Sequence, residues 1–318
     1  MDILLAQPRG FCAGVVRAVE IVEQALDLYG PPVYVFHEIV HNHRVVKDLL
    51  ARGAVFTETI SDIPSGSIAI FSAHGVSMSI VEQAQQRRLR VIDATCPLVT
   101  KVHLQARKYA DKGYEVIIVG HQGHPEVEGT RGSLDGRVHV LCSLEEVDSL
   151  QVRDPEHVAY VTQTTLSVDD TRDVLDALKR RFPAIQGPEL NDICYATQNR
   201  QTAVRNLSRE IDVLLVVGAR NSSNSNRLRE VGEHSGVMAY LVQDADDLQP
   251  DWFLPDMRVG ITAGASAPEI LVQQVLQRLL RRFGKCSVRE VHGLRESTSF
   301  RLPASLLTAG KVQTGTVN

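Results

Sequence analysis

The amino-acid sequence predicts an α/β fold, with three similar small α/β domains in a pseudo-threefold trefoil around a central cavity. The first observation behind this prediction is a short apolar run that ends in a cysteine at the expected first turn of a helix. It occurs three times, at Cys12, Cys96 and Cys194. The second is an apolar strand with polar residues at its end, which follows each cysteine at nearly the same distance. This period is too long for a solenoid, whose repeats span roughly 20 to 50 residues.

The first expected domain covers residues 1–96 and alternates helices with strands, as α/β domains do. Apolar residues from Val15 to Leu26 recur at steps of three and four, which predicts a helix. Gly30 and the two prolines after it are expected to end this helix. A strand, a helix and a second strand are expected after it, at 33–36, 42–53 and 68–74.

The second expected domain covers residues 97–193 and the third covers 194–281. Pro97 suits the first position of a helix, and a more polar helix follows Cys194. The remainder, 282–318, is expected to pack on the body as a tail whose last residues, from 308, are disordered. The strands expected in the second and third domains are 116–120, 158–165, 213–218 and 259–266.

Composition and charge exclude several classes of protein. The chain is 43% hydrophobic and 23% charged, which are ordinary values for a globular protein. A net charge of −4 and the lack of a basic tract give no case for nucleic-acid binding. The N-terminus lacks the basic region of a signal peptide, and no apolar run is long enough to cross a membrane. We therefore expect a soluble, cytoplasmic protein.

The cysteines are not expected to form disulfides, because the cytoplasm keeps thiols reduced. Three thiols at matched positions are the minimum set for a metal ion or an iron–sulfur cluster, and a helix N-terminus favours the thiolate that binds metal. A single cysteine is more often a small buried hydrophobic residue. That interpretation is kept for Cys142 and Cys286, which lie outside the threefold pattern.

Polar residues at the strand ends predict a site for a small, strongly anionic ligand. In α/β sheets, ligands bind beyond the carboxyl ends of the strands. His124 and Glu126 present an imidazole and a carboxylate that can bind an anion and deliver a proton. Residues 221–226 carry hydroxyl and amide side chains just before a helix, a pattern that favours phosphate binding. Comparable strand-end positions are held by His74, Thr164 and Ser266.

The string HEIVH at 37–41 matches the HExxH signature of zinc hydrolases. That motif places both imidazoles on one face only when it lies within a helix. Here it follows a strand, so we expect His37 at the strand end and His41 in a turn, and zinc hydrolysis is kept as an alternative. No glycine-rich dinucleotide or nucleotide motif occurs, so any electrons must arrive from another protein.

Eight short strings resemble the 4-hydroxy-3-methylbut-2-enyl diphosphate reductase family, also called LytB/IspH. They occur in matching order and cover roughly residues 1–280. The strings are PRGFCAG at 8–14, HEIVHN at 37–42, FSAHGVS at 71–77, DATCPLV at 93–99, GHPEVEGT at 123–130, TQTTLS at 162–167, DICYAT at 192–197 and NSSNSNR at 221–227.

This resemblance implies a trefoil around one [4Fe–4S] cluster per chain, held by Cys12, Cys96 and Cys194. One iron is then left without a protein ligand and binds the substrate hydroxyl. Thr164 would bind that hydroxyl by a hydrogen bond, and Glu126 would supply protons, directly or through water. With Ser223 nearby, the diphosphate would be held by His41, His74, His124, Ser222, Asn224 and Ser266.

The reaction implied by the resemblance is a reductive dehydroxylation. Two one-electron reductions and protonation expel the hydroxyl as water and yield isopentenyl or dimethylallyl diphosphate, the last step of the methylerythritol phosphate pathway to isoprenoids. The implied partners are the allylic diphosphate substrate and a one-electron donor protein such as ferredoxin or flavodoxin.

Two other interpretations stay open at this point. A redox-neutral hydro-lyase can also use a [4Fe–4S] cluster with an open iron, and dependence on a reductant separates the two reactions. A non-catalytic zinc or iron sensor could use the same three thiols. It leaves the polar run at 221–226 without a purpose, and zinc without labile sulfide in purified protein would favour it.

Overall fold

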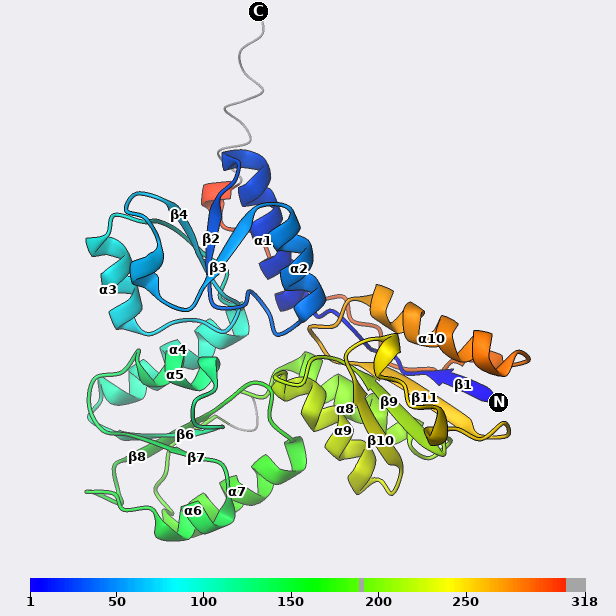
Figure 1. The fold of residues 1–318 in the computed structure, drawn as a ribbon. Coiled ribbons are helices and arrows are strands. Elements are labelled where there is room, and N and C mark those ends of the chain that lie inside the picture. Colours follow the sequence, from blue (N-terminus) through cyan, green and yellow to red (C-terminus); the bar gives the residue numbers. More distant parts are fainter. Residues whose placement is uncertain (189–191, 307–318) are drawn as a thin grey trace, which may run out of the picture.

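The computed structural model describes residues 1–188 and 192–306, and it shows three α/β lobes arranged around a centre (Figure 1). The paired strands of each lobe run parallel. The predicted trefoil is therefore confirmed. The expected disorder from residue 308 onward lies outside the described residues.

The first lobe is built on a sheet of strand order β3-β2-β4-β5. Figure 1 shows α1 and α2 on one side of this sheet and α3 on the other. Alternate strand residues point to opposite faces, so Val35 and Ile70 pack with α1 while Phe36 and Phe71 pack toward α3. The elements are α1 (Ala13–Tyr29), β2 (Val33–Phe36), α2 (His43–Ala51), β3 (Ala54–Thr57), a 3₁₀ turn (Ile60–Asp62), β4 (Ile68–Phe71), α3 (Met78–Gln86) and β5 (Arg90–Asp93).

The second lobe has the strand order β7-β6-β8. Its sheet is again covered on both faces: Ile117 packs with α6 and α7, and Ile118 packs with α4 and α5. Such burial on both faces is why its strands read as continuous apolar runs. The elements are α4 (Pro97–Ala110), β6 (Glu115–Val119), α5 (Pro125–Arg131), β7 (Val138–Leu141), α6 (Leu144–Ser149), β8 (Val158–Thr162) and α7 (Val168–Arg181).

The third lobe has the strand order β10-β9-β11-β1-β12. Helix α10 covers one face of this sheet, and α8 and α9 cover the other. The elements are β1 (Asp2–Leu5), α8 (Tyr195–Leu207), β9 (Val213–Val217), α9 (Ser223–His234), β10 (Met238–Val242), two 3₁₀ turns (Ala245–Asp247 and Pro250–Trp252), β11 (Arg258–Ala263), α10 (Glu269–Phe283) and β12 (Ser287–Glu290).

Strand pairing differs from the predicted division of the chain in one respect. β1 was expected in the first domain, yet it lies between β11 and β12 in the third sheet. Residues of the expected tail supply β12, and Leu306 packs into the core of the first lobe. A parallel strand that is buried on both faces carries no pattern that identifies its neighbours. The boundaries at 96, 193 and 281 otherwise stay predictions.

Each of the three matched cysteines is the N-cap residue of a helix. Cys12 precedes α1, Cys96 precedes α4 with Pro97 in the first turn, and Cys194 precedes α8. The prediction that all three begin helices is therefore confirmed. Because the three helices start at the centre of the trefoil, their N-termini bring the thiols into one region.

The HEIVH string is not helical. β2 ends at Phe36, His37 has a positive φ of 60°, and α2 begins only at His43. The Asn42 side chain caps α2 by accepting from the backbone N–H groups of Arg44 and Val45. His41 thus lies in the connection before the helix, as the sequence predicted, and does not share a helical face with His37.

Candidate active site

A cavity with a volume of about 110 Å³ lies between the three lobes. Its walls are strand-end loops and helix N-termini, the places where open α/β sheets bind ligands. The structure brings together every site residue named from the sequence. Lining the cavity are Cys12, Cys96, Cys194, His41, His74, His124, Glu126, Thr164, Ser222, Ser223, Asn224 and Ser266.

The thiols of Cys12 and Cys96 lie close together beside Gly14. A Cβ atom on Gly14 would be 2.7 Å from the sulfur of Cys96 and 3.8 Å from that of Cys12. Real Cβ atoms do not approach a sulfur so closely, so only glycine leaves the sulfur of Cys96 its space. Cys194 lines the same cavity, and none of the three forms a disulfide.

Burial opposes ionisation of two of these thiols in the metal-free protein. It raises the pKa of Cys96 to about 12 and that of Cys194 to about 11. Backbone N–H groups at the start of α4 act in the opposite direction on the pKa of Cys96, as expected for a helix N-terminus, but burial outweighs them. A bound metal cation reverses this balance, because coordination removes the thiol proton.

The donor set of the cavity is chemically suited to an iron–sulfur cluster. The three free thiols share one cavity. Thiolates are the usual ligands of iron–sulfur clusters. Within the described part of the chain, no group of three or more histidine, cysteine, aspartate or glutamate side chains is arranged to hold a single metal ion.

Three histidines form the wall next to the thiols. The rings of His41 and His74 stack with centroids 4.2 Å apart, and His124 meets them edge-on at 5.7 and 5.9 Å. Burial, reinforced by the neighbouring histidines, lowers the pKa of His74 well below its usual value and that of His124 to about 4. Without a ligand, His74 and His124 are therefore neutral at pH 7, and an anion bound among them would favour their protonation.

His41 is anchored by contacts from two lobes. Its Nδ1 lies 3.0 Å from the carboxylate of Glu38, and its backbone carbonyl accepts from the hydroxyl of Ser266 at 2.9 Å. Its Nε2 is buried without a hydrogen-bond partner. A buried polar atom that faces a cavity without a partner marks a position where a ligand atom can bind.

The polar run at 221–226 was expected to precede a helix, but α9 already begins at Ser223, so Asn224 lies in its first turn. This run supplies a second buried atom without a partner. The Oδ1 of Asn224 accepts from the backbone N–H of Ala265 at 2.9 Å, so its Nδ2 is directed elsewhere and stays buried without a partner. Ser222 caps the helix by accepting from Ser225 N–H. The N-terminus of α9 adds positive potential. These groups and the three histidines form a polar part of the cavity, called the cradle below, whose chemistry suits a phosphate.

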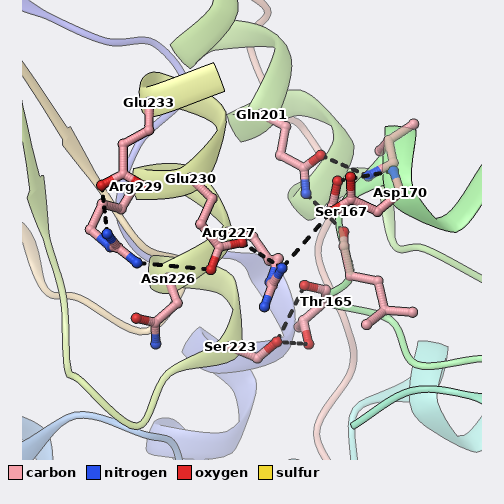
Figure 2. A network of polar contacts seen from close by, with 12 residues as sticks. Thr165, Ser167, Asp170, Gln201, Ser223, Asn226, Arg227, Arg229, Glu230 and Glu233 are labelled. Atoms are coloured by element: carbon pink, nitrogen blue, oxygen red, sulfur yellow. Dashed lines mark hydrogen bonds and ion pairs between the residues drawn. The ribbon is translucent and has the colours of Figure 1, made fainter. Parts of the chain in front are cut away.

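Ser223 also belongs to a polar network between the second and third lobes (Figure 2). Its hydroxyl lies 3.1 Å from that of Thr165. Arg227 of α9 reaches Asp170 of α7 at 3.9 Å and also pairs with Glu230. Gln201 of α8 bonds the backbone at both ends of the turn before α7. These contacts fix the loop after β8, which carries Thr164, against the third lobe.

Glu126 and Thr164 form a bonded pair at the inner wall. The backbone N–H and the hydroxyl of Thr164 donate to the two carboxylate oxygens of Glu126 at 2.6 and 3.0 Å. Burial of the carboxyl, which is 2% exposed, raises its pKa to about 7, although these two hydrogen bonds act in the opposite direction. A carboxylic acid with such a pKa can hold and release a proton at neutral pH.

Some lining residues were missed from the sequence. Thr197 donates its backbone N–H to the sulfur of Cys194 at 3.4 Å, and its hydroxyl lies 3.2 Å from that sulfur. Thr165 links the loop after β8 to Ser223. Cys194 and Thr197 are one helical turn apart, and this spacing could have predicted the contact of Thr197 with the sulfur.

The fold and the cavity define a class: a trefoil α/β protein with three free thiols next to a polar cradle in one central cavity. A family model described as LytB protein matches residues 3–280. The chain belongs to the LytB family.

Related proteins match along almost the whole chain. It is 57% identical over 306 residues to the 4-hydroxy-3-methylbut-2-enyl diphosphate reductase 2 of Bradyrhizobium diazoefficiens, covering 96% of this chain and 99% of that one. Identity is also 57% over 309 residues to the corresponding reductase of Shewanella oneidensis, covering 96% and 97%.

A solved structure, that of the E-1-hydroxy-2-methyl-but-2-enyl-4-diphosphate reductase from Plasmodium falciparum, superposes with a TM-score of 0.94 at 38% identity. That match covers 98% of this chain and 99% of the other.

Proposed function

We propose that this protein is a 4-hydroxy-3-methylbut-2-enyl diphosphate reductase, which acts in the last step of the methylerythritol phosphate pathway and yields isopentenyl and dimethylallyl diphosphate. The observation that carries the proposal is one cavity lined by three free thiols, a polar cradle and a buried carboxyl. The names of the relatives that are 57% identical to this chain support the same activity.

Cys12, Cys96 and Cys194 would hold a [4Fe–4S] cluster. Bound there, it supplies single electrons and, at the iron that no cysteine binds, a Lewis acid. Support comes from the placement of all three residues at helix N-termini, where the ends of α1, α4 and α8 favour negative charge.

The diphosphate would lie in the cradle formed by the histidines and the start of α9. His41 Nε2 and Asn224 Nδ2 belong to residues that line the cavity and are buried without hydrogen-bond partners, and they would meet phosphate oxygens. His74 and His124 are neutral at pH 7 without a ligand, and a bound diphosphate would favour their protonated forms. The cradle would thus bind the substrate, and its histidines would become protonated next to the bound diphosphate.

Thr164 and Glu126 would deliver the proton that turns the departing hydroxyl into water. With Glu126 protonated, its carboxyl can donate to the Thr164 hydroxyl, which is then free to donate to the substrate hydroxyl. Hydroxide is a poor leaving group, so this proton is needed as the carbon–oxygen bond breaks. The bonded geometry of the pair and the pKa of about 7 support this role.

The electrons would come from a separate one-electron donor protein, such as ferredoxin or flavodoxin, because the sequence carries no dinucleotide motif. None of the described helices is long and apolar enough to span a membrane. We place the reaction in the cytoplasm, where reduced thiols are available for the centre.

An anaerobic assay tests the proposal. Purified protein with verified iron and sulfide content is mixed with 4-hydroxy-3-methylbut-2-enyl diphosphate and a one-electron reductant, and five-carbon diphosphates are followed. Product that depends on both reductant and iron is expected. Loss of water without reductant would favour the hydro-lyase instead, and zinc without labile sulfide would favour a metal sensor.

A further inference from the structure

Two arginines that do not line the cavity, Arg17 and Arg200, take no part in the proposed reaction. Each lies on a helix that starts at one of the three cysteines, and each donates to backbone carbonyls in the loop that leads to a different cysteine. They therefore connect the three cysteine segments directly, across large distances in the sequence.

Arg200 joins the helix of Cys194 to the loop of Cys12. It lies on α8 and is fully buried, with 0% exposure. Its Nε and Nη2 donate to the carbonyl of Gly10 at 3.1 and 2.8 Å, and Nη2 also reaches that of Phe11 at 3.4 Å. Its Nη1 donates to Ala196, in the first turn of its own helix. The guanidinium thus spans both cysteine segments.

Arg17 joins the helix of Cys12 to the loop of Cys96. Its Nη1 donates to the carbonyls of Thr95 and Ala94 at 3.0 and 3.3 Å. The planar guanidinium suits this role because its donors are held in a fixed fork. Arg17 thereby fixes the residue that immediately precedes Cys96.

The C-terminal segment, residues 287–306, contacts both arginines. Glu296 accepts from Arg200 at 3.0 and 3.2 Å and from the side chain of Asn199 at 3.0 Å. The carbonyl of Arg301 accepts from Arg17 Nε at 2.8 Å. A fully buried guanidinium without a counter-charge is costly, so Glu296 makes the buried position of Arg200 tenable.

We propose that Arg17 and Arg200, held by the C-terminal segment, are positioning residues that set the spacing of the three thiols. The proposal rests on the proposed function, in which these thiols hold a cluster. Loss of either arginine releases one cysteine loop from the neighbouring helix. The cradle and the pair of Glu126 and Thr164 keep their contacts, because neither arginine touches them.

Three variants and a control test this role. Arg17→Gln removes the hydrogen bonds to the loop of Cys96, and Arg17→Lys keeps the positive charge at that position. The double variant Arg200→Gln/Glu296→Gln removes the hydrogen bonds to the loop of Cys12 without leaving a buried charge. The control is Arg205→Gln, which removes a more exposed arginine of the same helix α8 that pairs with Asp169. Iron and labile sulfide per chain, and the rate of iron loss to a chelator, are measured after anaerobic reconstitution.

The two Gln variants are expected to lose iron at least several-fold faster than the wild type, with Arg17→Lys intermediate and Arg205→Gln unchanged. In the metal-free proteins, backbone amides of residues 10–16 in the double variant and 94–100 in Arg17→Gln should exchange hydrogen at least tenfold faster than in the wild type. Wild-type rates of both iron loss and exchange would overturn the proposal.

The two readouts separate this proposal from the proposed function. If the wild type takes up no iron and sulfide, the proposal that the thiols hold a cluster is wrong. Amide exchange in the metal-free protein still tests whether the arginines hold the cysteine loops against the neighbouring helices. If the double variant does not fold, Arg17→Gln decides the matter, since Arg17 is only partly buried. Unchanged exchange in Arg17→Gln would then refute the role.

Discussion

The carboxyl of Glu126 is the residue on which the proposed proton transfer depends. It is buried at the inner wall, and both of its oxygens are already bonded to Thr164. Nothing else in that pair is acidic, so the carboxyl is the group that can hold a proton until the substrate hydroxyl leaves.

Glu126→Gln is expected to keep cluster content and diphosphate binding but to lower turnover at least about 100-fold, the usual effect of removing a general acid. The amide has nearly the same shape and can still accept from Thr164, but it has no acidic proton to give. The turnover number is measured alongside iron and sulfide content. Near-normal turnover at full cluster content would eliminate the proton-donor role.

The free energy of unfolding should depend on the protonation of the Glu126 carboxyl. Its pKa of about 7 in the folded protein lies above the ordinary value of 4.5, so the folded state binds the proton more tightly than the unfolded state. The resulting stabilisation is fully present below the ordinary value and is lost as pH rises through about 7, by up to about 3 kcal/mol. Denaturant unfolding of the metal-free protein at pH 5 and pH 8 should show this loss, and Glu126→Gln should lack it.

At the scale of elements, the helix starts that hold the thiols are the critical parts. Cys96→Ser should leave α4 in place, since Pro97 and the apolar face of the helix are unchanged. It should nevertheless lower the iron and sulfide content of reconstituted protein by more than half, because an alcohol is a much weaker ligand than a thiolate. Cys142→Ser, at an exposed thiol outside the cavity, is the matched control and should retain full content.

The start of α9 makes a separate contribution to binding. Asn224→Ala removes the buried Nδ2 donor and the acceptor for Ala265 N–H. We expect affinity for the diphosphate substrate to fall about tenfold or more, since a hydrogen bond to a charged group contributes about 1.5–3 kcal/mol. Calorimetric titration measures the affinity, and a full iron and sulfide content serves as the control. Unchanged affinity would show that Asn224 does not contribute to diphosphate binding.

Local patterns were enough to predict some elements and not others. The steps of three and four after Cys12, and Pro97 after Cys96, identified helix starts because these signals lie within one or two turns. The partner strands of β1 were not predictable, because they lie at the opposite end of the chain. Arg200 was missed for a similar reason: its acceptor at Gly10 is distant in sequence and carries no side chain to mark it.

At the scale of the whole molecule, the candidate site exists only where the three lobes meet. The predicted residues could be grouped from the sequence because each stood at a strand end or helix start, positions that face the centre of such a trefoil. The polar contacts that hold the lobes together, such as the pair of Thr165 and Ser223, followed no comparable rule.

The C-terminal segment should stabilise the assembled trefoil. A chain ending at Gly284 lacks β12, Glu296 and the buried Leu306, and burial of one such leucine alone contributes about 2 kcal/mol. We expect a lower denaturant midpoint for this truncated protein in its metal-free form. A chain ending at Leu306 is the control, because it keeps β12, Glu296 and Leu306; equal midpoints for the chains ending at Gly284 and at Leu306 would contradict the expectation.

The place of β1 in the third sheet also sets the order in which parts of the site can form during synthesis. β1 is made well before its two neighbours in the sheet, β11 and β12. At usual translation speeds, β1 waits on the order of fifteen seconds or longer for them. The loop of Cys12 follows β1 directly, so it reaches its final place only after these two strands have been made. Any inorganic centre that Cys12 helps to hold in this cavity would therefore be completed only after β11 and β12 exist.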